Sequence, residues 1–109
     1  MTERERLEKL NQLFFDYTAY LVFMARQIIA PGTYGYFALV KALQKVLEIK
    51  DFSGEIADDD FYGKIRGELN SFGGASSAEV DKWRPLLDRL VILYVRKMKE
   101  NIFKGENSK

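Results

Sequence analysis

The acidic run Asp58-Asp59-Asp60 is the group of residues in this sequence best suited to hold a metal ion. Hard cations such as Ca²⁺ and Mg²⁺ bind several carboxylate oxygens, which clustered acids can supply. The run lacks the alternating ligands, central glycine and distant glutamate of an EF-hand loop. Acids at a helix start also cap the backbone and interact favourably with the helix dipole. We therefore interpret Asp58, Asp59 and Asp60 as a helix start in preference to a metal site.

A second candidate site is the corner that follows Arg26 by about one helical turn. Its residues are Thr33, Tyr34, Gly35 and Tyr36. A helix start presents backbone N–H groups without partners, so a small anion could bind there with help from the Arg26 guanidinium. The corner lacks the glycine spacing and the Lys-Ser/Thr pair of a P-loop. The alternative is a tight helix–helix turn in which Arg26 caps carbonyls or pairs with an acid.

Asp16 is the third polar residue of interest, because it lies within an aromatic stretch. A carboxylate in apolar surroundings can act as a general acid or base. It can equally form a structural pair, either with Tyr20 one turn on or with Arg84 or Arg89 of the last helix. We favour the structural pair.

Cysteine and histidine are both absent from the 109 residues. Their absence excludes disulfides, thiolate zinc sites, cysteine nucleophiles and the Ser-His or Cys-His pairs of hydrolases. A metal site would have to be built from carboxylates. We expect no cofactor, and a non-enzymatic protein is the favoured interpretation, although enzymatic activity stays open.

The formal net charge is +1, so no global field favours nucleic acid or an anionic membrane. A basic cluster between Arg96 and Lys104 could contact phosphates, but a helix C-terminus favours basic residues for its own stability. The longest apolar stretch, from Tyr17 to Ala25, is too short to span a bilayer. The charged N-terminus does not resemble a signal peptide. We therefore expect a cytoplasmic protein that binds neither membrane nor nucleic acid.

Four amphipathic segments position these residues and predict helices over about 2–30, 34–49, 59–72 and 76–103. Capping-box patterns at Thr2/Glu5 and Ser76/Glu79 mark two helix starts, and Thr33 is the expected N-cap of the second helix. Residues 50–57 are expected to form a loop, and Gly73-Gly74 to end the third helix. Pro85 should kink the last helix or split off a short turn ahead of it. The prediction is an all-α, single-domain protein spanning residues 1–109, with an ordered core over about 3–103.

We expect these helices to form a four-helix bundle, up-and-down or a close variant, with the first and last helices as its main packing surface. The first helix carries a stripe of apolar residues spaced three and four apart: Leu7, Leu10, Phe14, Tyr17, Leu21, Met24 and Ile28. A second arc of the same helix holds Asp16, Tyr20, Phe23 and Gln27. A helix that is apolar nearly all round is normally buried on several sides. We therefore predict that this arc is the interface of a homodimer.

Several short motifs resemble a family of small prokaryotic all-helical proteins known as a domain of unknown function. The motifs are Phe15-Asp16-Tyr17-Thr18-Ala19-Tyr20-Leu21-Val22, Ala25-Arg26, Tyr34-Gly35, Leu39-Val40 and Leu86-Leu87-Asp88-Arg89-Leu90-Val91. The resemblance covers about residues 14–101. It implies a compact helical domain without a known activity, and it makes Arg26, Tyr34 and Gly35 the first positions to mutate.

Three functions follow as hypotheses. The first is a non-enzymatic, homodimeric interaction module. The second is a protein, possibly an enzyme, that binds a small ligand or anion at the corner between the first two helices. The third and weakest is a small helical subunit of a nucleoprotein assembly, which would be retained on nucleic acid in a salt-sensitive manner.

Overall fold

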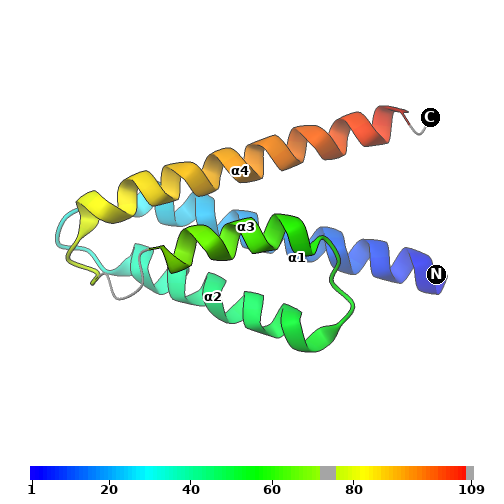
Figure 1. Cartoon of the computed structure of the whole chain (residues 1–109), viewed down its shortest axis with the longest axis horizontal. Coiled ribbons are helices and arrows are strands. Elements are labelled where there is room, and N and C mark those ends of the chain that lie inside the picture. The colour runs from blue at the N-terminus through cyan, green and yellow to red at the C-terminus, as the bar shows by residue number, and fades with distance from the viewer. Residues whose placement is uncertain (72–75, 108–109) are drawn as a thin grey trace.

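The described residues fold into four helices that run alternately up and down, as Figure 1 shows for this computed structural model. The structure describes residues 1–71 and 76–107, without the side chains of Asp59 and of residues 104–107. The helices are α1 (Glu3–Ile28), α2 (Gly35–Ser53), α3 (Asp59–Asn70) and α4 (Val80–Asn107). The predicted all-α four-helix bundle is confirmed.

The start of α1 forms the Thr2 half of the predicted capping box, and the Glu5 carboxylate bonds to the Thr2 hydroxyl instead of a backbone N–H. The Thr2 hydroxyl accepts a hydrogen bond from the backbone N–H of Glu5 at 3.1 Å and donates to the Glu5 carboxylate at 3.1 Å. Both groups come from one turn of the chain, so the sequence alone can specify this contact.

Both predicted boundaries of α2 were wrong. The N-cap residue is Tyr34, because the Thr33 hydroxyl donates to the Ala30 carbonyl instead, at 2.8 Å. The helix also continues four residues beyond Ile49 and ends at Gly54, whose φ of 68° is the left-handed conformation that glycine adopts readily. The added turn is stabilised by tertiary contact, since the buried Lys50 lies over the Tyr62 ring of α3.

The acidic run lies at the start of α3, as we interpreted it, with Asp58 at the N-cap position, but the Asp58 side chain does not form the expected cap. Its φ is 70°, and its carboxylate pairs with Lys97 of α4 at 2.7 Å. This tertiary ion pair takes the carboxylate away from the first turn of α3. The predicted end of α3 at Phe72 and the Gly73-Gly74 stop lie outside the described residues.

The last helix begins later than predicted. Residues 76–79 form a turn in which the Glu79 N–H donates to the Ser76 carbonyl at 3.1 Å, and the Glu79 carboxylate accepts from the Ser76 N–H at 2.8 Å. The helix α4 then runs from Val80 through Pro85 to Asn107. The kink at Pro85 stays a prediction. The helix therefore continues beyond residue 103, where the ordered core was predicted to end. Residues 108 and 109 lie outside the described residues.

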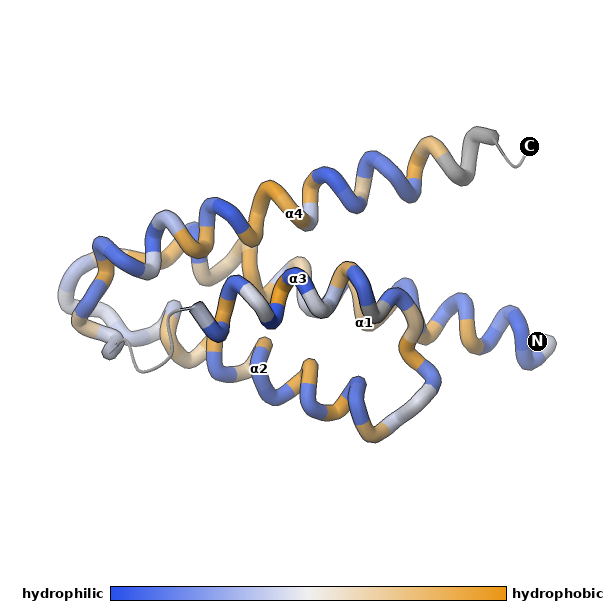
Figure 2. Tube along the Cα trace, in the orientation of Figure 1, coloured by the Kyte–Doolittle hydropathy of each residue, from blue (hydrophilic) through white to orange (hydrophobic). Residues whose placement is uncertain are grey.

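In the bundle, α1 packs most extensively against α2 and less against α4, so the expected dominance of the α1–α4 contact was wrong. The aromatic centre joins three helices: the Phe61 ring lies 5.7 Å from that of Phe15 and 5.0 Å from that of Tyr94. Figure 2 shows apolar residues concentrated along the middle of the bundle, whereas the first turns of α1 are mostly hydrophilic.

Candidate functional site

The side of α1 that faces away from the bundle carries an exposed apolar surface, which we call the α1 outer face. It consists of Leu13, Tyr17, Tyr20 and Ile28, with exposed fractions of 53, 51, 56 and 39%. Leu13, Tyr17 and Tyr20 are three, four or seven apart and so share one side of the helix. Ile28 extends the strip, because the eight residues from Tyr20 to Ile28 make little more than two helical turns.

The buried side of α1 differs from the predicted stripe. Leu21 of the predicted stripe is buried, but Tyr17 and Ile28 of the stripe are exposed. The other buried residues of the helix lie outside the stripe: Phe15, Thr18, Ala19, Val22 and Ala25. Because α1 is apolar nearly all round, its sequence is compatible with burial of more than one face. The positions of α2 and α4 decide which face is covered.

The predicted interface arc is partly open. Asp16, Tyr20 and Gln27 are exposed, whereas Phe23 is half-buried with its ring 6.4 Å from that of Tyr94 on α4. Among the described side chains, the Asp16 carboxylate accepts a hydrogen bond from Gln12 at 2.8 Å and pairs with neither Tyr20 nor the predicted arginines. The arc is therefore centred on Tyr20, and Phe23 belongs to the contact between α1 and α4.

Exposed apolar residues also lie on α4, which packs beside α1. Ile92 and Val95 have exposed fractions of 48 and 37%, and Ile102 and Phe103 near the end of the helix have fractions of 62 and 63%. The spacing of the apolar residues shows only that α4 has a broad apolar side. How much of that side is buried depends on how much of it the neighbouring helices cover.

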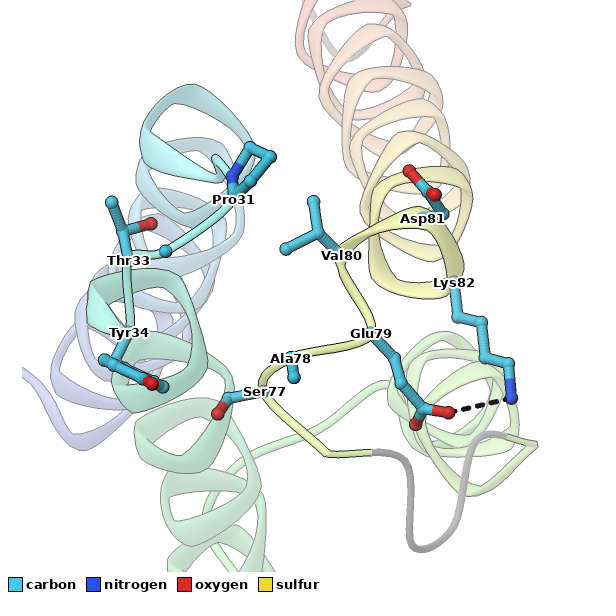
Figure 3. Close-up of a pocket in the computed structure, with 10 residues that line it drawn as sticks. Pro31, Thr33, Tyr34, Ser77, Ala78, Glu79, Val80, Asp81 and Lys82 are labelled. Atoms are coloured by element: carbon cyan, nitrogen blue, oxygen red, sulfur yellow. Dashed lines mark hydrogen bonds and ion pairs between the residues drawn. The ribbon is translucent and has the colours of Figure 1, made fainter.

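The corner between α1 and α2 contains a pocket of about 450 Å³ (Figure 3). Pro31, Thr33 and Tyr34 form one wall and residues 77–82 form the other. The Trp83 indole N–H holds the second wall by donating to the Ser76 carbonyl at 3.0 Å. The sequence thus located one wall of this pocket, but the second wall comes from residues more than 40 positions away.

The other residues predicted for the corner do not line this pocket. Arg26 pairs with Asp88 of α4 at 2.5 Å, as its alternative interpretation anticipated. A Cβ atom on Gly35 would lie 3.1 Å from the Ile28 side chain, so Gly35 serves the close approach of α1 and α2. Tyr36 is fully buried and its hydroxyl donates to the Ser77 carbonyl, and burial raises the pKa of this hydroxyl.

The charge of the corner pocket does not favour an anion. Glu79 and Asp81 contribute two carboxylates to its lining, and Lys82 contributes one ammonium group. The Lys82 ammonium donates to the Glu79 carboxylate at 3.0 Å and, with the Ser76 N–H, holds the pKa of that carboxyl below its usual value (Figure 3). Glu79 is therefore ionised at neutral pH.

The acidic run does not assemble a metal site among the described side chains. Asp58 is paired with Lys97, Asp60 is exposed, and the Asp59 side chain lies outside the described residues. Within the same part of the chain, no group of three acidic residues lies close enough to hold a metal ion.

None of the helices in the described ranges is both long enough and apolar enough to cross a membrane. No protein family, curated protein or solved structure matches this sequence.

Proposed function

We propose that this protein is a non-enzymatic interaction module that forms a homodimer through the α1 outer face. The observation that carries the proposal is the exposure of four large apolar side chains, Leu13, Tyr17, Tyr20 and Ile28, on one side of one helix. Single exposed apolar residues are common on protein surfaces, whereas a contiguous strip marks an interaction site. Two of the four are tyrosines, which are enriched at interfaces.

The exposed area is a large part of what a specific dimer needs. At about 150 to 200 Å² for each large side chain, the α1 outer face exposes roughly 300 to 400 Å². A specific interface covers about 800 Å² on each partner, of which roughly 60% is apolar. The strip therefore supplies most of the apolar share of one interface, and polar neighbours such as Asp16 and Gln27 supply its rim.

A second copy of the chain is the partner that fits this surface best. A two-fold dimer places the same patch on both sides of the interface, so an apolar strip on one copy meets its equivalent on the other. The aromatic hydroxyls of Tyr17 and Tyr20 can reach the polar rim while their rings are buried. Neither tyrosine would then leave an unpaired polar group inside the interface.

Sedimentation equilibrium of the wild type and two variants tests the proposal. The wild type should be a dimer at micromolar concentration. Tyr20→Glu should weaken association at least about a hundredfold, because it removes roughly 100 Å² of apolar area per copy and buries a charge. Phe52→Glu is the matched control, since Phe52 is 92% exposed at the end of α2 and lies outside the face.

Three results would overturn the homodimer. These are a monomeric wild type, a Tyr20→Glu variant that associates like the wild type, and a Phe52→Glu variant that dissociates instead. Far-UV circular dichroism verifies that both variants remain helical. Phe23→Glu is a poor test because Phe23 packs on Tyr94, so a charge there would also perturb the fold.

Small-ligand binding at the corner between α1 and α2 is the lesser candidate function. The size of the corner pocket favours it, because ligand sites commonly measure about 300 to 1,000 Å³. The carboxylates of Glu79 and Asp81 argue for a neutral or cationic ligand in place of an anion. Native mass spectrometry of freshly purified protein would reveal such a ligand as a reproducible added mass.

A further inference from the structure

The second half of α4 carries an exposed surface of mixed apolar and basic character, which we call the α4 outer face. Its members are Ile92, Val95, Arg96, Lys99, Ile102 and Phe103, all of them exposed. Each member lies three or four positions from another, so the six side chains share one side of the helix. The α4 outer face has no residue in common with the α1 outer face, so an inference drawn from it does not depend on the homodimer.

The α4 outer face is open partly because α4 is longer than its neighbour α3. Asp58, just before α3, pairs with Lys97 at 2.7 Å, so the turns of α4 after Lys97 run beyond the start of α3 (Figure 1). Ile102 and Phe103 lie on these turns. At about 150 to 200 Å² for each large side chain, the four apolar members expose roughly 300 to 400 Å². A contiguous apolar surface of this size marks an interaction site.

The two basic members of the face carry charges that no described side chain balances. Neither Arg96 nor Lys99 forms an ion pair or a hydrogen bond with another side chain in the described part of the molecule. Glu100, the acid one turn after Arg96, lies 3.8 Å from the Lys97 ammonium. The charges of Arg96 and Lys99 lie midway along the face, with apolar residues at both of its ends. The middle of the face is therefore positive.

This arrangement of charge decides which partner fits. A two-fold dimer brings the same patch of both copies together, so Arg96 and Lys99 of one copy would face their equivalents, and like charges oppose association. An anionic membrane is also disfavoured, because the basic clusters that bind such lipids commonly hold about four to eight basic residues. The α4 outer face therefore fits an acidic segment of another protein.

We propose that the α4 outer face binds an amphipathic helix of another protein, whose middle turn is acidic and whose end turns are apolar. From Ile92 to Phe103 the face is about 16 Å long at about 1.5 Å per residue, so a helix of about three turns covers it. Carboxylates of the partner would pair with Arg96 and Lys99. Apolar contacts at both ends would exclude water from these ion pairs, which strengthens them.

Fluorescence anisotropy with a labelled synthetic peptide tests the proposal. The probe is an alanine-based helical peptide of about 20 residues, which presents two glutamates on one face with leucines one turn to either side. Its matched control peptide has two lysines in place of the glutamates. The wild type should bind the glutamate peptide saturably, at least about tenfold more tightly than the lysine peptide.

Three protein variants locate the binding. The double variant Arg96→Glu, Lys99→Glu should reverse the preference and bind the lysine peptide more tightly. Lys64→Glu changes an exposed lysine of α3 in the same way and should bind like the wild type. Ile102→Ser should bind the glutamate peptide at least about tenfold more weakly, because it removes an apolar side chain that is 62% exposed in the free protein. This neutral change keeps the test decisive even if the double variant does not fold.

Equal affinities of the wild type for the two peptides would overturn the proposal, as would an Ile102→Ser variant that binds like the wild type. A wild type that binds neither peptide would also overturn it, and co-sedimentation with vesicles of phosphatidylserine and phosphatidylcholine would then identify a membrane as the occupant of the face. Tyr20→Glu should bind the glutamate peptide like the wild type, so failure of the homodimer and failure of this proposal are distinguishable.

Discussion

Replacing Tyr94 by phenylalanine should stabilise the protein. Tyr94 is fully buried, and its hydroxyl forms no hydrogen bond of good geometry within the described part of the chain, only a weak interaction with the Thr18 side chain. A buried polar group left unpaired costs about 1 to 3 kcal/mol. Phenylalanine keeps the ring, and with it the contacts to Phe15 at 5.3 Å and to Phe61 at 5.0 Å.

The expected gain follows from two opposing contributions. Removal of the unpaired hydroxyl recovers at least about 1 kcal/mol. The hydroxyl leaves a hole on the order of 10 to 15 Å³, which costs about 0.3 kcal/mol at about 24 cal/mol per Å³. Tyr94→Phe should therefore raise the free energy of unfolding by about 1 kcal/mol, or the Tm by about 4 to 8 °C.

Urea unfolding followed by far-UV circular dichroism measures this difference, with Tyr36→Phe as the matched control. Tyr36 is equally buried, but its hydroxyl donates to the Ser77 carbonyl. Tyr36→Phe should lower the free energy of unfolding by about 1 kcal/mol, because the bond is lost and the carbonyl is left without it. A Tyr94→Phe variant destabilised as much as Tyr36→Phe would refute the reasoning, since it would mean that the Tyr94 hydroxyl is bonded in solution.

Two further predictions concern the helix ends and their interiors. Gly67→Ala should raise the free energy of unfolding by about 0.5 to 1 kcal/mol in urea titrations, because alanine is the better helix former and its Cβ would contact no other atom within 4 Å. Gly54→Ala should lower the free energy of unfolding by about 1 kcal/mol, because the φ of Gly54 is positive. A destabilised Gly67→Ala variant would contradict the free space seen there. Lys82 and the Ser76 N–H hold the pKa of Glu79 below its unfolded-state value of about 4.5. The ionised Glu79 therefore contributes to stability above that pH, and the contribution is lost as the pH falls through the lower folded-state pKa. Thermal unfolding between pH 7 and pH 3 should therefore show a smaller decrease in Tm for Glu79→Gln than for the wild type, and parallel decreases would argue against this role of Glu79.

The helices and several of their ends are determined by residues close together in the sequence. The capping pair of Thr2 and Glu5 lies within one turn, and the break at Pro31-Gly32 requires no distant partner. Amphipathic spacing is likewise a local property, so the number and order of the helices followed from it. These features could be predicted because the chain satisfies them before any tertiary contact forms.

The sites depended on contacts that no local pattern encodes. Asp58 was predicted as part of a helix cap, but its carboxylate pairs with Lys97, 39 positions away. Lys50 was expected to lie in a loop. Its burial against Tyr62 could not be predicted from local residues, because it requires α3 to pack on the end of α2. The sequence of α1 alone determined that this helix has more apolar surface than one neighbour can cover. Only the packing of α2 and α4 decided that Thr18 is buried while Tyr17 and Tyr20 face outward, because an apolar face is buried only where another element is wide enough to cover it.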